Sequence, residues 1–262
     1  MRKLFMCVLL LAGTLTLQAQ IKIGKMKIDT KKAIQAGKDA AGAITLSDED
    51  IANMSQEYIQ WMDTHNKVAA PDSELGKRLA KITANFPKIE GLKLNFAIYE
   101  VVDVNAFACG DGSIRIFAGL MELMTDDEVL AVIGHEIGHV VHQDTKHAMK
   151  NAYLRSAAKN VAGAVSETAS KLTNSQLGAL AEAFMGAQFS QKQENEADDY
   201  GVEFCVKNGI DPYAMANALS KLAELAKDAP KASYAQRMFS SHPDTQKRIE
   251  RTKAKADSYA KK

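Results

Sequence analysis

The sequence predicts an α+β fold that is mainly α and contains one small antiparallel sheet. Segments with apolar residues at helical spacing, several of them opened by a capping residue, cover most of residues 46–255. Between residues 92 and 117, apolar and polar residues alternate as in half-buried strands, and Gly-Asp-Gly at 110–112 predicts a turn. Charged residues interrupt every apolar stretch between residues 146 and 190, so no membrane-spanning helix is expected in the mature chain.

The first residues are typical of an export signal. Arg2 and Lys3 precede an apolar run from residue 4 to 17, and Ala19 is a suitable small residue for cleavage. We therefore expect residues 1–19 to be a signal peptide and the mature protein to be exported to a periplasm. An uncleaved anchor is the alternative, although the apolar run is short for a spanning helix. Cys7 lies inside the run rather than at its end, which argues against a lipoprotein anchor.

The remaining chain is expected to hold a Lys-, Ala- and Gly-rich lead-in at 20–45 that is mobile or loosely helical, one domain at 46–255 and a tail at 256–262. The 33 basic and 32 acidic residues of the full sequence nearly cancel, so we expect no nucleic-acid partner. An exported chain could pair Cys109 with Cys205, and two free buried thiols are equally consistent with the sequence.

Two helices are expected before the sheet. The first begins after Ser47, a suitable N-cap, and carries Ile51, Met54 and Tyr58 at helical spacing. The second covers residues 73–86 and ends before a proline.

The sheet is expected from three strands, at 92–101, 105–109 and 113–117. Thr125 and Glu128 then form a capping-box pattern that predicts a helix from residue 126 to the mid-140s. Further helices are expected near 190–207 and 212–228, with a last helix after the segment SSHP at 240–243.

The helix from residue 126 carries His135-Glu136-x-x-His139. Residues four apart share one helix face, so the two imidazoles can reach the same metal ion, and Glu136 lies at the edge of that face. Apolar residues lie roughly on the opposite face of the helix, so the opposite face can be buried while the histidine face presents the ligands. Gly134 and Gly138 each cost about 1 kcal/mol of helix propensity against alanine, which suggests close approach of another backbone beside the site. A histidine pair on an ordinary surface helix is the alternative.

A third ligand is available downstream. Glu194 and Asp198 are one helical turn apart on the segment ENEAD, so Glu194 could bind the metal and Asp198 could orient a ligating histidine. A solvated acidic helix face remains the alternative at this point.

The motifs together resemble a known family. HEIGH (135–139) is followed by ENEAD (194–198), and it is preceded by NAFACG (105–110) and by the helix TDDEVLAVIGHE. The C-terminal segment SSHPDTQKRI (240–249) completes the pattern. This combination resembles the zinc endopeptidases grouped with HtpX, BepA, LoiP and the CAAX prenyl proteases, over residues 45–252.

The resemblance implies a zincin-like metallopeptidase domain with one zinc ion per chain. It makes His135, His139 and Glu194 the zinc ligands, Glu136 the general base and Asp198 a residue that holds a ligand in place. Two departures leave the surroundings of the site open. Many relatives carry Arg-His where this chain has Gln143-Asp144, and a small or hydroxyl residue is common at the position of Cys109.

The resemblance also suggests how substrate is bound and controlled. A polypeptide would pair with the strand Asn105-Ala106-Phe107-Ala108-Cys109 as an added strand, which reads side chains only weakly. His242 would reach the zinc and block it, or it would share with Arg248 a role in the transition state. A plain surface turn is the alternative for this segment, and His65, His142 and His147 are not expected to bind metal.

The function expected from these features is zinc-dependent endoproteolysis of misfolded or assembling cell-envelope proteins, in quality control. Both a freely diffusing periplasmic protein and one peripherally associated with the membrane fit the sequence. A periplasmic chaperone or assembly factor that uses the same cleft with little proteolysis is the main alternative. A membrane-associated scaffold that uses the Ala- and Gly-rich residues 150–190 is the second.

Overall fold

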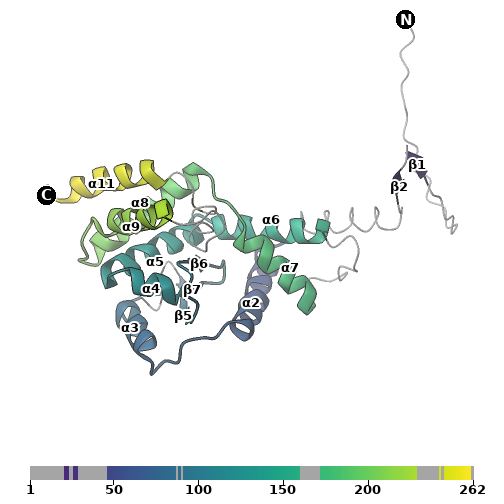
Figure 1. The fold of residues 1–262 in the computed structure, drawn as a ribbon, viewed down its shortest axis with the longest axis horizontal. Helices are drawn as coiled ribbons and strands as arrows, with labels where there is room; N and C mark the ends of the chain where they lie inside the picture. The colour runs from purple at the N-terminus through teal and green to yellow at the C-terminus, as the bar shows by residue number, and fades with distance from the viewer. Residues whose placement is uncertain are drawn as a thin grey trace, which may run out of the picture.

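The computed structural model describes residues 21–23, 26–28, 46–86, 88–89, 91–159, 172–228, 242 and 245–260. The expected signal peptide at 1–19 lies outside these residues. Within them, a buried helix, α5 (Asp126–Val141), lies between two layers. Figure 1 shows α8 (Gln191–Lys207), α9 (Ala214–Asp228) and α11 (Thr245–Ala260) on one side of α5, and the sheet and α4 (Ala118–Leu123) on the other. The expectation of a mainly helical α+β domain is confirmed.

The sheet differs from the expected antiparallel arrangement. Its strands are β5 (Asn95–Tyr99), β6 (Ala106–Ala108) and β7 (Ser113–Phe117), in the order β5-β7-β6. β6 and β7 form the expected antiparallel hairpin, but β5 runs parallel to β7. The chain between β5 and β6 crosses the end of β7, where the amide of Gly119 donates a hydrogen bond to the carbonyl of Val101. Alternation predicts strands but not their partners, so the antiparallel expectation was wrong for β5.

Two short hairpins complete the described strands. β3 (Lys88–Ile89) pairs with β4 (Leu92–Lys93), so the predicted strand 92–101 is divided into β4 and β5. β1 (Ile21–Ile23) pairs with β2 (Met26–Ile28), a hairpin that the mobile or loosely helical expectation for the lead-in did not include.

The helix starts are determined by capping side chains, as the sequence predicts. α2 (Asp48–His65) begins with a capping box at Ser47, α3 (Glu74–Thr83) with Ser73, and α5 with the box formed by Thr125 and Glu128. Each hydroxyl accepts a hydrogen bond from a backbone amide that the helix itself leaves without a partner.

Three features of the helices were not predicted. α5 ends at Val141, and after a two-residue turn a separate helix, α6 (Asp144–Lys159), follows. α7 (Asn174–Met185) packs with α6 and α2, and the three form a group at the right of the body in Figure 1. α11 continues to Ala260, through most of the expected tail.

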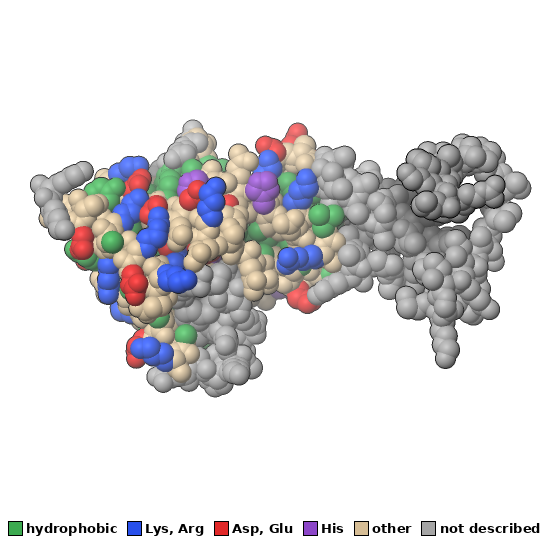
Figure 2. Space-filling view, turned by 90° about the horizontal axis from the view of Figure 1, so that it is seen from above, with side chains coloured by type: hydrophobic (Ala, Val, Ile, Leu, Met, Phe, Trp, Pro, Cys, Tyr) green, Lys and Arg blue, Asp and Glu red, His purple; other side chains and the backbone are tan. Residues whose placement is uncertain are grey.

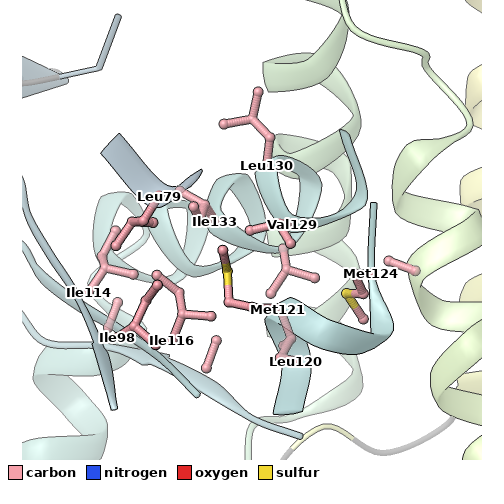
Figure 3. Close-up of a cluster of buried hydrophobic side chains, with 14 of the residues drawn as sticks. Leu79, Ile98, Ile114, Ile116, Leu120, Met121, Met124, Val129, Leu130 and Ile133 are labelled. Carbon is pink, nitrogen blue, oxygen red and sulfur yellow. The ribbon is translucent and has the colours of Figure 1, made fainter. Parts of the chain in front are cut away.

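The main core joins α5 to the sheet. Figure 3 shows Ile114 and Ile116 of β7 facing Val129 and Ile133 of α5, with Met121 of α4 beside them. All five side chains are completely buried. Each such side chain contributes about 1.5–3 kcal/mol to stability, so α5 is fixed firmly against the sheet. A second cluster surrounds the ring pair of Tyr58 and Phe184, whose centroids are 5.3 Å apart.

The surface carries both signs of charge. On the face seen in Figure 2, basic and acidic side chains are interspersed. Among the described residues, none of the helices combines the length and apolar character needed to cross a membrane.

Candidate metal centre

α5 brings its two histidines to one point. His135 is 3% exposed and His139 is fully buried, and their Nε2 atoms lie 3.1 Å apart. Two imidazole nitrogens directed at one point are placed so that a single metal ion could bind both of them. Glu136 is also buried, and its Oε1 has no hydrogen-bond partner.

α8 crosses α5 at very short range, as the two glycines of α5 suggested. A Cβ on Gly138 would lie 3.0 Å from Cα of Ala197, and one on Gly134 would lie 3.2 Å from Cα of Gly201. The contact allows Glu194, in the first turn of α8, to face both histidines. Its Oε1 lies 3.5 Å from Nε2 of His139, and its Oε2 lies 3.7 Å from Nε2 of His135.

A third imidazole joins this group. Nδ1 of His242 lies 2.8 Å from Oε1 of Glu194, and His242 is only 8% exposed. His135, His139, Glu194 and His242 each offer one ligand atom within 4.8 Å of the others. Imidazole and carboxylate groups are the usual nitrogen and oxygen ligands of zinc. The residues therefore fit this ion, and Glu194 is not on a solvated acidic face.

Each histidine of α5 has a carboxylate on its other ring nitrogen. Nδ1 of His135 lies 3.0 Å from Oδ1 of Asp198, the residue expected to hold a ligand. Nδ1 of His139 lies 2.9 Å from Oδ2 of Asp144, which the sequence did not indicate as a site residue. The only sequence feature that pointed to Asp144 was that this chain has Gln143-Asp144 where many relatives carry Arg-His. The ring of Phe189, also not predicted, stacks on His139 with centroids 4.0 Å apart.

Arg248 lies between the two acids of α8. Its Nε and Nη2 donate to the two oxygens of Asp198 at 2.7 and 2.6 Å, and its Nη1 lies 2.6 Å from Oε2 of Glu194. Only 2% of Arg248 is exposed. This geometry favours a role in holding the two carboxylates over the substrate contact considered from the sequence.

The charges of the site depend on one another. Burial lowers the pKa of His135. Burial opposes the charged form of His139 as well, but the carboxylates of Asp144 and Glu194 outweigh it and raise its pKa to about 9. Burial would raise the pKa of Glu194, yet His242 and His139 hold it well below its usual range. The buried carboxylates thus give the site a negative charge that a metal cation can neutralise. When no metal is bound, a proton on His139 neutralises part of that charge.

A pocket opens between the general-base candidate and the sheet edge. β6 is one of the two edge strands of its sheet, and residues 105–108 form one wall beside Glu136. The rest of the lining is mainly apolar. Besides Asn105, Ala106, Phe107, Ala108 and Glu136, the lining consists of Thr145, Ala148, Phe184, Met185, Ala187, Phe189 and His242. The site therefore has an apolar space next to an unpaired carboxylate oxygen.

The remaining candidates lie elsewhere. His142 and His147 are exposed and outside the metal group, as expected, and His65 stacks on Trp61.

Cys109 and Cys205 are both free and buried, so the sequence alternative of two free thiols is correct and that of a disulfide is not. Burial raises the pKa of both thiols, that of Cys205 to about 12, so neither is a reactive nucleophile.

Comparison with known proteins decides the family. Residues 69–256 match the model of Peptidase family M48. The chain belongs to peptidase family M48. It is 39% identical to the metalloprotease YcaL of Escherichia coli strain K12 over 85% of this chain and 86% of that protein. It is 37% identical to the metalloprotease LoiP of the same strain, over 88% of this chain and 90% of that one.

A more distant relative is the beta-barrel assembly-enhancing protease of Yersinia pestis, 28% identical over 83% of this chain and 46% of that protein. M48 metallopeptidases use zinc, and the group of His135, His139, Glu194 and His242 is positioned to hold it. This M48 protein is therefore a metallopeptidase whose cofactor is zinc, and its substrates are polypeptides.

Proposed function

We propose that the protein is an endopeptidase in which His135, His139 and Glu194 hold zinc and Glu136 is the general base. The observation that carries the proposal is the convergence of three buried ligand groups from two helices on one point, with Glu136 beside them. A surface histidine pair would not place a buried carboxylate from α8 within 4 Å of both imidazoles.

The bound zinc would polarise the scissile carbonyl and lower the pKa of the attacking water. Glu136 takes the proton of that water, because its Oε1 has no other hydrogen-bond partner within the described protein and lies at the pocket. It then returns the proton to the leaving amine. Asp198 and Arg248 keep His135 and Glu194 in place during this exchange.

The substrate would lie extended along β6, an edge strand, and pair with its backbone. The apolar side of the pocket would take an uncharged side chain next to the scissile bond. Ala148 lies in this lining, so Ala148→Phe should lower cleavage of unfolded proteins while zinc content stays at the wild-type level. Unchanged cleavage would show that peptides bind elsewhere.

His242 would occupy the position that the attacking water needs, and so hold the peptidase latent. The support is its 2.8 Å contact with Glu194 and its place in the metal group. His242→Ala should raise peptidase activity with zinc retained. Reduced activity would instead support a role in the transition state, and unchanged cleavage would rule out both roles.

The central experiment compares Glu136→Gln with the wild type. Purified wild type should hold about one zinc per chain, and the variant should keep the metal and lose proteolysis. Glu196→Gln is the matched control, because Glu196 lies on α8, is 43% exposed and pairs with Lys192 away from the metal group. A wild type without zinc, or an active Glu136→Gln variant, contradicts the proposal.

In the cell, we place this activity in the periplasm, on misfolded or assembling envelope proteins. The export signal and the similarity to a beta-barrel assembly-enhancing protease support this placement. The alternative is a chaperone that uses the cleft without cutting, and the intact Glu136 favours cleavage over it. If Glu136→Gln restores a deletion phenotype, the chaperone role is the correct one. Flotation with liposomes would test the membrane-associated alternatives.

A further inference from the structure

The turn between α5 and α6 has an unfavourable backbone conformation next to the metal group. Gln143 has a φ of 63°, and in the described part of the chain no other residue except glycine has a positive φ. For an L-residue this left-handed conformation costs roughly 1–2 kcal/mol. Such strain persists where the surroundings require a particular path of the chain.

The path brings Asp144 back beneath His139. Asp144 is 5% exposed, and its Oδ2 lies 2.9 Å from Nδ1 of His139. A carboxylate can only accept, so Nδ1 must carry the hydrogen and donate it. In the neutral ring, which is the form that binds a metal, the lone pair of His139 is then on Nε2, the atom 3.5 Å from Oε1 of Glu194.

The other oxygen of Asp144 is held by α8. Nε2 of Gln193 donates to Oδ1 of Asp144 at 2.7 Å. The Oε1 of the same amide accepts from the backbone N–H and the hydroxyl of Ser190, which completes the capping box of α8. Both ends of the Gln193 amide are therefore engaged, and its orientation is fixed between the helix cap and Asp144.

We propose that Asp144, held by Gln193, is a positioning residue that fixes the tautomer and the ring of His139 and thereby sets the affinity for zinc. This inference rests on the proposed metal site. It gives the protein two carboxylate–histidine pairs, with Asp198 behind His135 and Asp144 behind His139. Loss of such a partner typically lowers metal affinity 10–100-fold.

A different role would give a different result. Asp144 is also the first residue of α6, where a negative charge stabilises a helix N-terminus. In that role it would contribute to folding without any effect on zinc. The two roles are separated by measuring metal affinity and the stability of the metal-free protein independently.

The test uses the full mature chain as the wild type, Asp144→Asn, Asp144→Glu and the control Glu196→Gln. Zinc affinity is measured by competition with a chromophoric chelator, and metal-free stability by thermal unfolding. In D144N an NH2 group replaces one of the two oxygens that accept from His139 and Gln193, so one of these hydrogen bonds is lost and zinc affinity should fall 10–100-fold. D144E keeps the charge and should recover part of that loss, and E196Q should stay within about twofold of the wild type.

A spectrum provides a further readout. The cobalt-substituted D144N variant should show altered visible absorption, because the ring of His139 is free to turn. Should D144N not fold, the comparison of D144E with E196Q decides the question. Zinc affinities equal to the control in the variants that fold would overturn the inference, even if thermal stability falls. A wild type that binds no zinc would instead contradict the proposed function.

Discussion

Gly138→Ala tests whether the α5–α8 crossing holds the metal residues in place. A Cβ at this position would lie 2.9 Å from Cβ of Tyr200 and 3.0 Å from Cα of Ala197, whereas carbon atoms pack best at about 3.5–4.0 Å. The helices must therefore separate by about half an ångström. Alanine gains about 1 kcal/mol of helix propensity, but overpacking of this kind costs about 1–3 kcal/mol. We expect a net loss of stability of up to about 2 kcal/mol.

The zinc affinity should fall as well. Glu194 and Asp198 lie on the same helix as Ala197, so a shift of α8 moves both acids relative to the histidines of α5. Metal sites need their ligands held within about 0.5 Å. Urea unfolding of the metal-free protein and chelator competition for zinc measure the two effects separately.

The matched control for this substitution is Gly178→Ala in α7. A Cβ there would lie 3.7 Å from the nearest side-chain atom, on Trp61, which is ordinary contact. This variant should gain about 1 kcal/mol with no change in zinc affinity. If Gly138→Ala is stabilised as much as Gly178→Ala and binds zinc as tightly as the wild type, the role assigned to the crossing is incorrect.

Three further outcomes are expected from urea unfolding. Gln143→Gly should stabilise the protein by about 0.5–1 kcal/mol, because glycine adopts a positive φ without strain, and zinc affinity should not change; a loss of stability would show that the turn is not strained. Arg248→Met should destabilise the metal-free protein by about 3–5 kcal/mol, because it removes the guanidinium that pairs with the buried carboxylates of Asp198 and Glu194, and a loss below 1 kcal/mol would contradict that assignment. His139 has a folded pKa of about 9, above the unfolded value of about 6.5, so its stabilisation of the metal-free protein is complete below pH 6.5 and is lost as pH rises through 9. A metal-free protein whose stability stays level between pH 6.5 and 9.5 would refute this pairing.

The features predicted correctly from the sequence are those determined by neighbouring residues. Thr125 and Glu128 form the expected capping box, and the glycines of α5 face another helix because a close crossing allows no side chain there. HEIGH and ENEAD led to the residues that meet in the structure, since each motif lies within one helical turn.

The features that were missed depend on distant contacts or on a single backbone angle. β5 pairs in parallel because its chain crosses the end of β7, and no local pattern indicates that path. Asp144 reaches His139 because Gln143 adopts a positive φ, which is rare for glutamine and cannot be read from residue type. No separate helix was expected between the mid-140s and about residue 190, whereas α6 and α7 lie there and pack with each other and with α2.

Arg248 has a consequence for the timing of activity. It lies more than a hundred residues after His135 in the chain, yet it neutralises the two carboxylates that stand beside the histidines. A chain that has not yet been synthesised as far as α11 lacks Arg248, the guanidinium that pairs with both acids in the folded protein. We therefore expect the metal centre to be completed late in folding, when α11 packs against α8 and brings Arg248 to the two acids.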